Sequence, residues 1–323
     1  MRLSVERERI HKGLKYTYFM EPSRIEKYKI YDIFHNGQIV IITPLIEAIL
    51  EIQYIGLPFN CNECPDNHTR VYFLKTDYKD EIELQINGST IKTRVNKYPE
   101  FKDEIIFSTL VKNEDAYILQ WIDYYIKLGV QRFIIYDNSR ESTLAETLKQ
   151  YIEHNIVLLI IWNYPYNLKA QQTQQNHSIY AFQNSKYIGL FDIDEYINIQ
   201  NKRINNIELF LNFIIEEHKI NTEEISGFMF LNRFFNNPYR LPCENTDFFN
   251  IFNCDEVSEE GFEKCVIIPK NVKTFSVHVV TDGLPLILLD KSDVYFNHYY
   301  FLNKENRGLD KTDLIDKSIL SLI

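Results

Sequence analysis

The chain has 323 residues, of which 45% are hydrophobic and 25% charged, and its formal net charge is −10. These proportions are typical of a globular protein with one large domain or two ordinary ones. Non-specific nucleic-acid binding needs a basic face, so the negative charge argues against a nucleic-acid partner.

The N-terminal hundred residues predict a β-rich region. In the stretch IELQINGSTIKTRV (residues 82–95) apolar and polar residues alternate on both sides of Asn87-Gly88. This pattern is typical of a β-hairpin with its turn at that dipeptide. An earlier run, GQIVIITPLI, predicts another strand closed by Pro44. We therefore expect a β-rich N-terminal region over residues 1–100 and a catalytic domain over 101–323.

From about residue 104 strands and helices alternate with short connections. Strands are expected at EIIFSTLV, RFIIYDNS, IVLLIIW and YIGLFDIDEYI, and helices at about 118–128, 142–154 and 169–184. This order predicts an α/β fold with a mostly parallel, Rossmann-like sheet flanked by helices, because parallel strands need crossover connections. In such sheets ligands bind at the carboxyl ends of the strands.

Polar residues stand at those predicted strand ends. They are Lys112, Asn113 and Glu114 after the first strand, Asp137 and Asn138 after the second, and Asp192, Asp194 and Glu195 after the fourth. If the chain stays extended, Asp192 and Asp194 project to the same side and can reach one ion or its water shell. Their oxygen atoms favour Mg²⁺ or Mn²⁺, which could bridge the two phosphates of a nucleotide diphosphate. The alternative is a solvated loop with helix-capping acids.

Several segments resemble one enzyme family in the right order. VKNEDAYILQWIDYYIKLGVQRFIIYDNS resembles the start of a GT-A glycosyltransferase of family 92 and the related family 2-like group. QTQQNHSIYAFQNSKYIGLFDIDEYI resembles the helix and metal-binding strand of that group, with Tyr196 in place of the usual Phe and Ser178 where Cys is frequent. VKTFSVHVV and DVYFNHYYFLNKENRG resemble its late S-V-H and N-H-Y…R-G elements. The resemblance runs from about residue 105 to 310.

The resemblance implies a GT-A fold that binds a nucleotide diphosphate sugar, with a UDP-sugar favoured, across the strand ends. A divalent ion, Mn²⁺ or Mg²⁺, would neutralise the leaving diphosphate. Asp194 would be the direct ligand, and Asp192 would contact the ribose or a metal-bound water. His298 matches the late histidine that such folds often add as a ligand; a lone histidine would otherwise be read as a core or surface residue.

Other residues would bind the donor. Asn113, Glu114, Asp137 and Asn138 would contact the nucleoside, unless they are only turn and cap residues. Lys304 and Arg307 could meet phosphate oxygens, as could Lys169 at the start of the polar helix.

An inverting transfer needs a base that deprotonates the acceptor hydroxyl. The resemblance implies such a residue after the strand GFMFLNRFF (residues 227–235). Glu244 and Asp247 are the candidates, with Asp255 behind them, although acidic loop residues are often only solvated.

The five cysteines, at 61, 64, 243, 254 and 265, do not suggest a disulfide scaffold. Cys61 and Cys64 form a C-x-x-C pair near His68, but structural zinc normally takes four ligands and a second pair is missing. Reduced cysteines are the favoured interpretation, with zinc left open.

The expected protein is a metal-dependent hexosyltransferase that moves a sugar, with galactose suggested by the resemblance, to a glycan hydroxyl with inversion. One alternative is a nucleotidyl- or phosphotransferase, which would want a Gly-rich phosphate loop that this chain with 10 Gly lacks. Another is an inactive carbohydrate-binding protein of the same fold. No window reaches the roughly 18–20 apolar residues of a membrane span, and the start lacks a secretory signal. We therefore expect no transmembrane segment, and a cytoplasmic protein or an excised catalytic domain.

Overall fold

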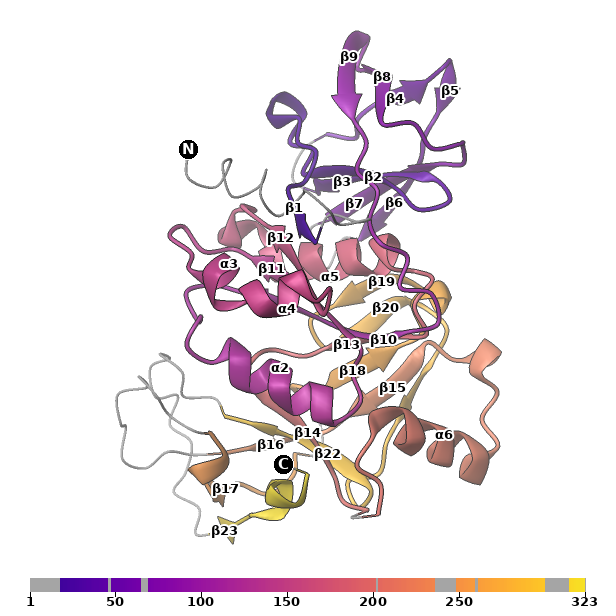
Figure 1. Cartoon of the computed structure of the whole chain (residues 1–323). Coiled ribbons are helices and arrows are strands. Elements are labelled where there is room, and N and C mark those ends of the chain that lie inside the picture. Colours follow the sequence, from indigo (N-terminus) through magenta and orange to yellow (C-terminus); the bar gives the residue numbers. More distant parts are fainter. Residues whose placement is uncertain are drawn as a thin grey trace.

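The computed structural model describes residues 18–45, 48–64, 69–201, 203–235, 248–258, 261–299 and 314–322. Its elements are arranged around one large mixed sheet, with a β-rich region above it and a small sheet below it in the view of Figure 1.

The large sheet has eight strands in the order β1-β12-β11-β10-β13-β18-β15-β21. The strands are β1 (Phe19–Met20), β12 (Val157–Ile161), β11 (Arg132–Asp137), β10 (Ile105–Val111), β13 (Tyr187–Leu190), β18 (Lys264–Ile267), β15 (Gly227–Phe230) and β21 (Leu286–Leu288). The first five are parallel neighbours, whereas β18 runs antiparallel to both β13 and β15. The expected α/β fold with a mostly parallel sheet is confirmed.

Helices cover both faces of this sheet (Figure 1). They are α2 (Ile118–Lys127), α3 (Leu144–Thr147), α4 (Lys149–Glu153), α5 (Ala170–Ala181) and α6 (Ile207–His218). The single helix expected at 142–154 is two short helices, because the backbone leaves the helical region at Leu148. On β10, Phe107 packs against α2, while the next residue, Ser108, hydrogen-bonds to α5. Because successive strand residues point to opposite faces, α2 and α5 lie on opposite sides of the sheet.

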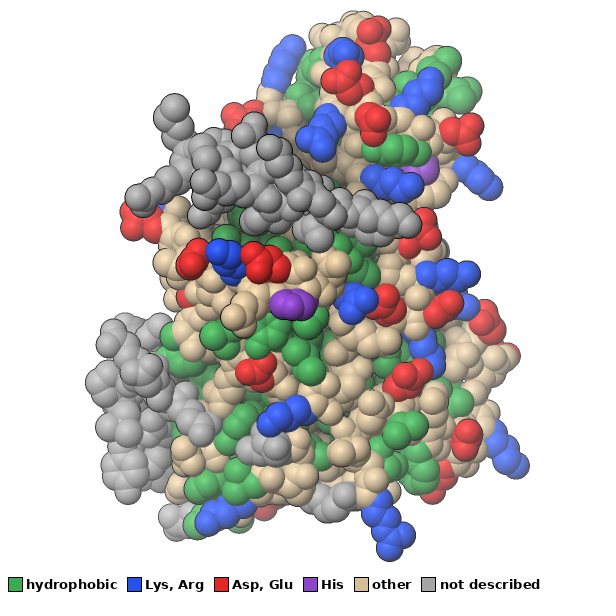
Figure 2. All heavy atoms as spheres, viewed as in Figure 1, with side chains coloured by type: hydrophobic (Ala, Val, Ile, Leu, Met, Phe, Trp, Pro, Cys, Tyr) green, Lys and Arg blue, Asp and Glu red, His purple; other side chains and the backbone are tan. Residues whose placement is uncertain are grey.

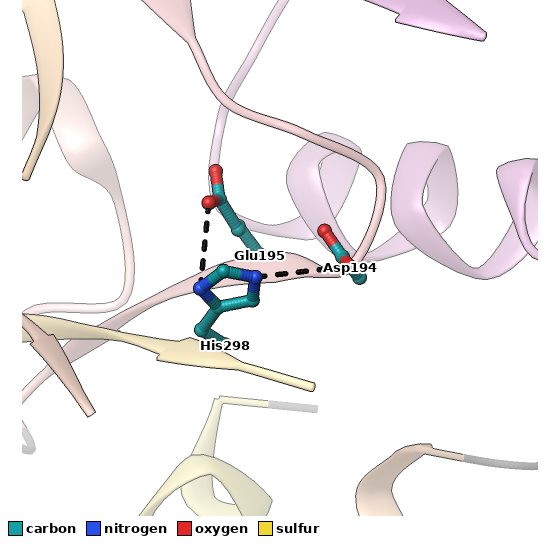
Figure 3. Close-up of side chains that lie close together, drawn as sticks. All are labelled: Asp194, Glu195 and His298. Carbon is teal, nitrogen blue, oxygen red and sulfur yellow. Dashed lines mark ion pairs between the residues drawn. The ribbon is translucent and has the colours of Figure 1, made fainter. Parts of the chain in front are cut away.

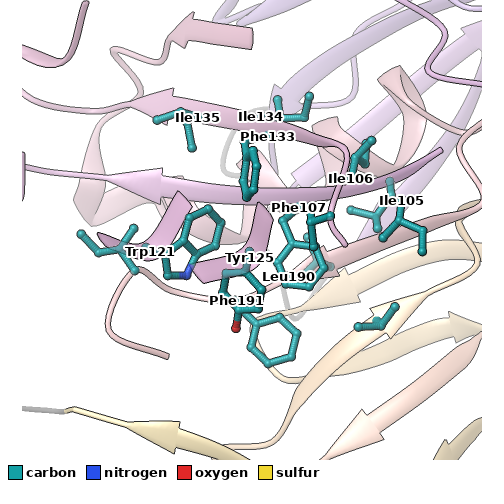
Figure 4. Packing of buried hydrophobic residues seen from close by; sticks show 14 of the residues in the cluster. Ile105, Ile106, Phe107, Trp121, Tyr125, Phe133, Ile134, Ile135, Leu190 and Phe191 are labelled. Carbon is teal, nitrogen blue, oxygen red and sulfur yellow. The ribbon is translucent and has the colours of Figure 1, made fainter. Parts of the chain in front are cut away.

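The core between α2 and the sheet contains aromatic rings packed among aliphatic side chains (Figure 4). The Phe107 ring lies 4.4 Å from Tyr125 and 5.5 Å from Phe191, centroid to centroid. Its position requires a glycine on the neighbouring strand, because a Cβ on Gly189 would lie 2.4 Å from the Phe107 ring. The core therefore reaches the end of β13, where the predicted carboxylates follow.

The N-terminal region contains two four-stranded sheets, which confirms its β-rich character. One has the order β2 (Asp32–His35), β3 (Ile39–Pro44), β7 (Thr69–Leu74) and β6 (Asn60–Cys64); the other has β5 (Leu57–Pro58), β4 (Ile52–Tyr54), β8 (Glu81–Ile86) and β9 (Ser89–Arg94). The hairpin expected around Asn87-Gly88 is confirmed, with Ile86 opposite Ser89 and positive φ angles at both turn residues. Strand β1 leaves this region and joins the large sheet beside β12.

A small sheet follows the large one at the carboxyl end of β13. It has the order β14 (Glu195–Ile199), β22 (Val294–His298) and β16 (Asn232–Phe234). The remaining strands form two pairs, β19 (Val272–Ser276) with β20 (Val279–Gly283) and β17 (Asn253–Cys254) with β23 (Leu314–Ile315). Short 3₁₀ helices span Glu26–Tyr28, Tyr166–Leu168, Thr222–Glu224, Phe248–Asn250, Pro269–Asn271 and Ser318–Ser321.

Acidic and basic side chains are interspersed on the face shown in Figure 2. Across the described ranges, no helix combines the length and the hydrophobicity that a bilayer span requires.

Candidate metal and donor site

The carboxylates that follow β13 lie in a turn between two sheets. The strand expected to run to residue 197 ends at Leu190, and β14 begins at Glu195 in the small sheet. The Glu195 N–H donates to the Asp192 carbonyl at 3.1 Å, and the Asp192 N–H donates to the Glu195 carboxylate at 2.8 Å. Asp192 and Asp194 are therefore not related by extended geometry, as the sequence suggested, because the turn passes the chain from one sheet to the other.

The turn brings Asp194 and Glu195 to His298, as Figure 3 shows. Glu195 and His298 are register partners on β14 and β22. His298 Nε2 lies 3.7 Å from Asp194 Oδ2, and Nδ1 lies 3.7 Å from Glu195 Oε1. The three residues are buried, and each offers one ligand atom within 4.8 Å of the others. These distances exceed hydrogen-bond length and are compatible with an ion between the three groups.

The Asp192 carboxylate is held by two side chains from other segments of the chain. Its Oδ2 lies 2.7 Å from the Lys264 ammonium, and its Oδ1 accepts a 2.7 Å hydrogen bond from Gln171 at the start of α5. The same ammonium lies 3.2 Å from Glu195 Oε2. Asp192 keeps 35% of its side chain exposed, whereas Lys264 is buried. Asp192 therefore lies beside the cluster of Asp194, Glu195 and His298, with its carboxylate oriented by the lysine and the amide.

The charged side chains of this site carry an excess of negative charge. Burial raises the pKa of Glu195 to about 7, although Lys264 opposes the shift. Burial also disfavours the charged form of His298, but the Asp194 and Glu195 carboxylates together outweigh it and raise the pKa of His298 above its ordinary value. Lys264 pairs with Asp192 and Glu195, and Asp194 lies beside His298, so a divalent cation would balance the negative charge of the three carboxylates.

Lys264 gives a direct test of this charge balance. We expect Lys264→Met to lower the free energy of unfolding by about 3 kcal/mol, because Asp192 and Glu195 then lack their buried counter-ion. Chemical denaturation measures the change. The matched control is Lys270→Met, which removes an exposed 2.8 Å ion pair with Glu223 and should cost less than about 1 kcal/mol. Equal stability of the two variants would contradict the balancing role.

The residues expected to bind the nucleoside follow β10 and β11. Asn113 is exposed in the left-handed region, with φ 58°, and its N–H donates to Ser139 Oγ at 2.9 Å. Asp137 is buried and accepts the Ser139 N–H, and burial raises the pKa of its carboxyl group. Asn138 donates both amide hydrogens to the Trp162 and Tyr164 carbonyls, and among the described residues no donor to its side-chain oxygen is recorded. These contacts hold the loops after β10, β11 and β12 together.

Two further expected donor residues lie in neighbouring loops. Glu114 is half-buried after β10, and Lys169 is exposed in the left-handed region directly before α5. The Lys112 ammonium lies 4.0 Å from the centroid of the Tyr166 ring, so the loop after β10 contacts the segment before α5. β10 neighbours both β11 and β13, so these loops lie at the same edge of the sheet as the carboxylate turn.

Several sequence predictions lie outside the described residues. They are Glu244, Asp247, Lys304, Arg307 and the zinc candidate His68. Asp255 is half-buried, and its N–H donates to the Phe234 carbonyl. The described cysteines Cys61, Cys254 and Cys265 are free thiols.

Sequence reasoning missed three participants of the site. Glu195 was noticed as an acid but was not assigned a role, although the turn makes it a third candidate ligand. Gln171 belongs to the polar stretch QTQQNHS, whose many amides on one helix were a usable signal. Lys264 gave only a weak signal, a lysine at the start of the apolar strand KCVI.

Comparisons with known proteins give a consistent family. The model of Glycosyltransferase family 92 matches residues 107–319. The family 92 protein At1g27200 of Arabidopsis thaliana is 26% identical over 163 residues, 48% of this chain and 28% of that protein. The family 92 protein RCOM_0530710 of Ricinus communis is 30% identical over 104 residues, 32% of this chain and 18% of that protein. The aligned stretches thus span less than a third of either relative.

Among solved structures, S. aureus TarS 1–349 aligns with a TM-score of 0.36 and 13% identity, covering 61% of this chain and 60% of that one. HddC from Yersinia pseudotuberculosis aligns with a TM-score of 0.33 and 12% identity, covering 60% of this chain and 92% of that one. The family match covers more than half of the chain and includes β13, the carboxylate turn and His298. The chain belongs to glycosyltransferase family 92.

Proposed function

We propose that this chain is a metal-dependent glycosyltransferase that moves a hexose from a nucleotide diphosphate sugar to a hydroxyl group of a glycan. The observation that carries the proposal is the buried cluster of Asp194, Glu195 and His298 at the carboxyl end of β13. Family membership supports glycosyl transfer in general, and the cluster supports the proposal of a divalent ion.

Mn²⁺ or Mg²⁺ fits the donor set of this cluster. Two carboxylates and one imidazole supply oxygen and nitrogen ligands, and Lys264 leaves the net charge of the site negative. Bound there, the ion would supply Lewis-acid stabilisation of the departing diphosphate. His298 Nε2 faces Asp194 and Nδ1 faces Glu195. An ion held by either carboxylate would therefore lie on the side of one of the two imidazole nitrogens.

The protein itself positions the donor. Asp192 is held by Gln171 and Lys264 with part of its carboxylate exposed, so it can accept a hydrogen bond from a ribose hydroxyl. Asn113, Glu114, Asp137 and Asn138, at the ends of β10 and β11, would contact the nucleobase and ribose, with Lys169 and Arg307 meeting phosphate oxygens. A UDP-sugar is the favoured donor, galactose is the favoured sugar, and inversion is the favoured outcome; all three rest on family resemblance.

Calorimetry with UDP and UDP-galactose, each with Mn²⁺ and with a chelator, tests the proposal. We expect binding to weaken by at least about tenfold when the metal is removed, because the diphosphate then faces uncompensated carboxylates. Product analysis separates the reaction classes. A glycosyltransferase releases UDP and leaves the sugar on its acceptor, whereas a nucleotidyltransferase would cleave the diphosphate. Nucleotide binding that ignores Mn²⁺ would contradict the metal-dependent donor site.

A further inference from the structure

His278 lies beside the lysine that orients Asp192. It stands in the turn between β19 and β20, and its Nδ1 forms a 2.8 Å hydrogen bond with the Glu263 carbonyl. The Cys265 thiol donates to the His278 carbonyl at 3.2 Å. Glu263 and Cys265 flank Lys264, whose ammonium holds Asp192 at 2.7 Å.

The β19–β20 hairpin packs against α5, the helix that provides Gln171 to Asp192. His278 therefore lies beside the strand end that holds Asp192.

The surroundings of His278 fix its tautomer. A carbonyl oxygen only accepts hydrogen bonds, so Nδ1 must carry the hydrogen, and in the neutral ring Nε2 keeps a lone pair. Nε2 has no hydrogen-bond partner among the residues that the structure describes, and the side chain is half-buried. Burial lowers the pKa of His278; the Lys264 ammonium lowers it further, and the Asp192 and Glu263 carboxylates oppose both. The ring is thus a neutral proton acceptor at neutral pH.

We propose that His278 is the catalytic base that deprotonates the acceptor hydroxyl, which rests on the proposed glycosyl transfer. The hydroxyl oxygen forms a bond to the anomeric carbon of the sugar while the bond from that carbon to the diphosphate oxygen breaks. The electron pair of the broken bond leaves with the diphosphate. The hydroxyl proton moves to Nε2, and the imidazolium later returns it to water.

This assignment differs from the carboxylate bases suggested by the sequence. Glu244 and Asp247 lie outside the described residues, whereas His278 is held in one tautomer by the Glu263 carbonyl. A fixed tautomer lowers the cost of orienting the base in the transition state. The two assignments predict different mutant behaviour.

His278→Asn is the sharpest variant, because the asparagine amide can still donate to the Glu263 carbonyl while Nε2 is lost. Transfer from UDP-galactose with Mn²⁺ is followed as UDP release, with methyl glycosides and water as acceptors. We expect the asparagine variant to lower kcat about 10²- to 10⁴-fold and to leave the calorimetric Kd of UDP within twofold. The acid limb of the wild-type pH–rate profile, at a pH below the ordinary histidine pKa, should disappear. His154→Asn is the matched control, because the His154 Nδ1 also hydrogen-bonds to a backbone carbonyl, that of Gln150, but His154 is exposed on α4.

NMR of the imidazole nitrogens in the wild-type protein gives a readout that needs no turnover. We expect a neutral ring with hydrogen on Nδ1. A protonated ring at pH 7, or unchanged kcat in His278→Asn with a large loss in Glu244→Gln or Asp247→Asn, would overturn the assignment. Wild-type protein that binds no nucleotide would overturn the proposed function instead, so the two failures are distinguishable.

Discussion

Asp194→Asn is expected to remove Mn²⁺ binding almost completely while the fold stays intact. The asparagine keeps the shape of the side chain but loses the charge, so the buried cluster keeps one carboxylate and one imidazole. We expect the Mn²⁺ Kd to rise at least about 100-fold, more than the loss of an outer-shell partner would cause. Electron paramagnetic resonance of free Mn²⁺ measures it directly, and His298→Ala should behave in the same way.

Asp192→Asn distinguishes the role of Asp192 from that of Asp194. Asp192 is held by Gln171 and Lys264 outside the three-residue cluster, so this variant should change the Mn²⁺ Kd only a few-fold and weaken UDP binding instead. Glu83→Gln, an exposed carboxylate on β8, is the neutral control. If Asp192→Asn removed the metal and Asp194→Asn did not, the assignment of the ligands would be wrong.

Local patterns in the sequence were enough to predict most of the fold. The turn at Asn87-Gly88 has the positive φ angles that its residues tolerate, and the alternation of Ile82, Leu84 and Ile86 matches the buried face of β8. The buried runs at β10 to β13 are parallel strands, as their apolar composition indicated. These features depend on neighbours in the chain, which a sequence shows.

The details of the candidate site depend on contacts between distant segments, which a single sequence does not show. Asp192 meets Lys264, 72 residues later, and Glu195 meets His298 through the register of β14 and β22. The turn at residues 191–194 could not be told from a continued strand, because Phe191 and Ile193 are apolar and both are buried. His298 was found only through the family resemblance, since a lone histidine has no spacing partner in the sequence.

The N-terminal region is expected to be essential for folding of the family-matched part, although that match begins only at residue 107. Strand β1 pairs Phe19 with Leu159 at the edge of the large sheet. Asp32 on β2 is fully buried, and its Oδ2 accepts hydrogen bonds from His177 on α5 at 2.8 Å and from Tyr98 at 2.6 Å. Its Oδ1 accepts from the N–H groups of Ser23 and Ile33 and from the Asn96 amide.

Asp32→Ala should therefore lower the free energy of unfolding by about 3–5 kcal/mol, because five donors, four of them buried, lose their acceptor. Asp80→Ala is the matched control, since Asp80 is exposed in the same region and accepts one hydrogen bond from Tyr78; it should cost less than about 1 kcal/mol. A fragment of residues 101–323 should lack a cooperative thermal transition, because its sheet edge and α5 lose these partners.

The boundary predicted at residue 100 would then separate two structural regions that fold as one unit. His177 also hydrogen-bonds to Tyr136 at 2.7 Å, and Tyr136 directly precedes Asp137 at the end of β11. The same helix presents Gln171 to Asp192. Loss of Asp32 should therefore weaken UDP binding as well as stability, even at temperatures where the variant remains folded. A fragment of residues 101–323 that unfolds cooperatively and binds UDP like the whole chain would show instead that the N-terminal sheets only pack against a self-sufficient domain.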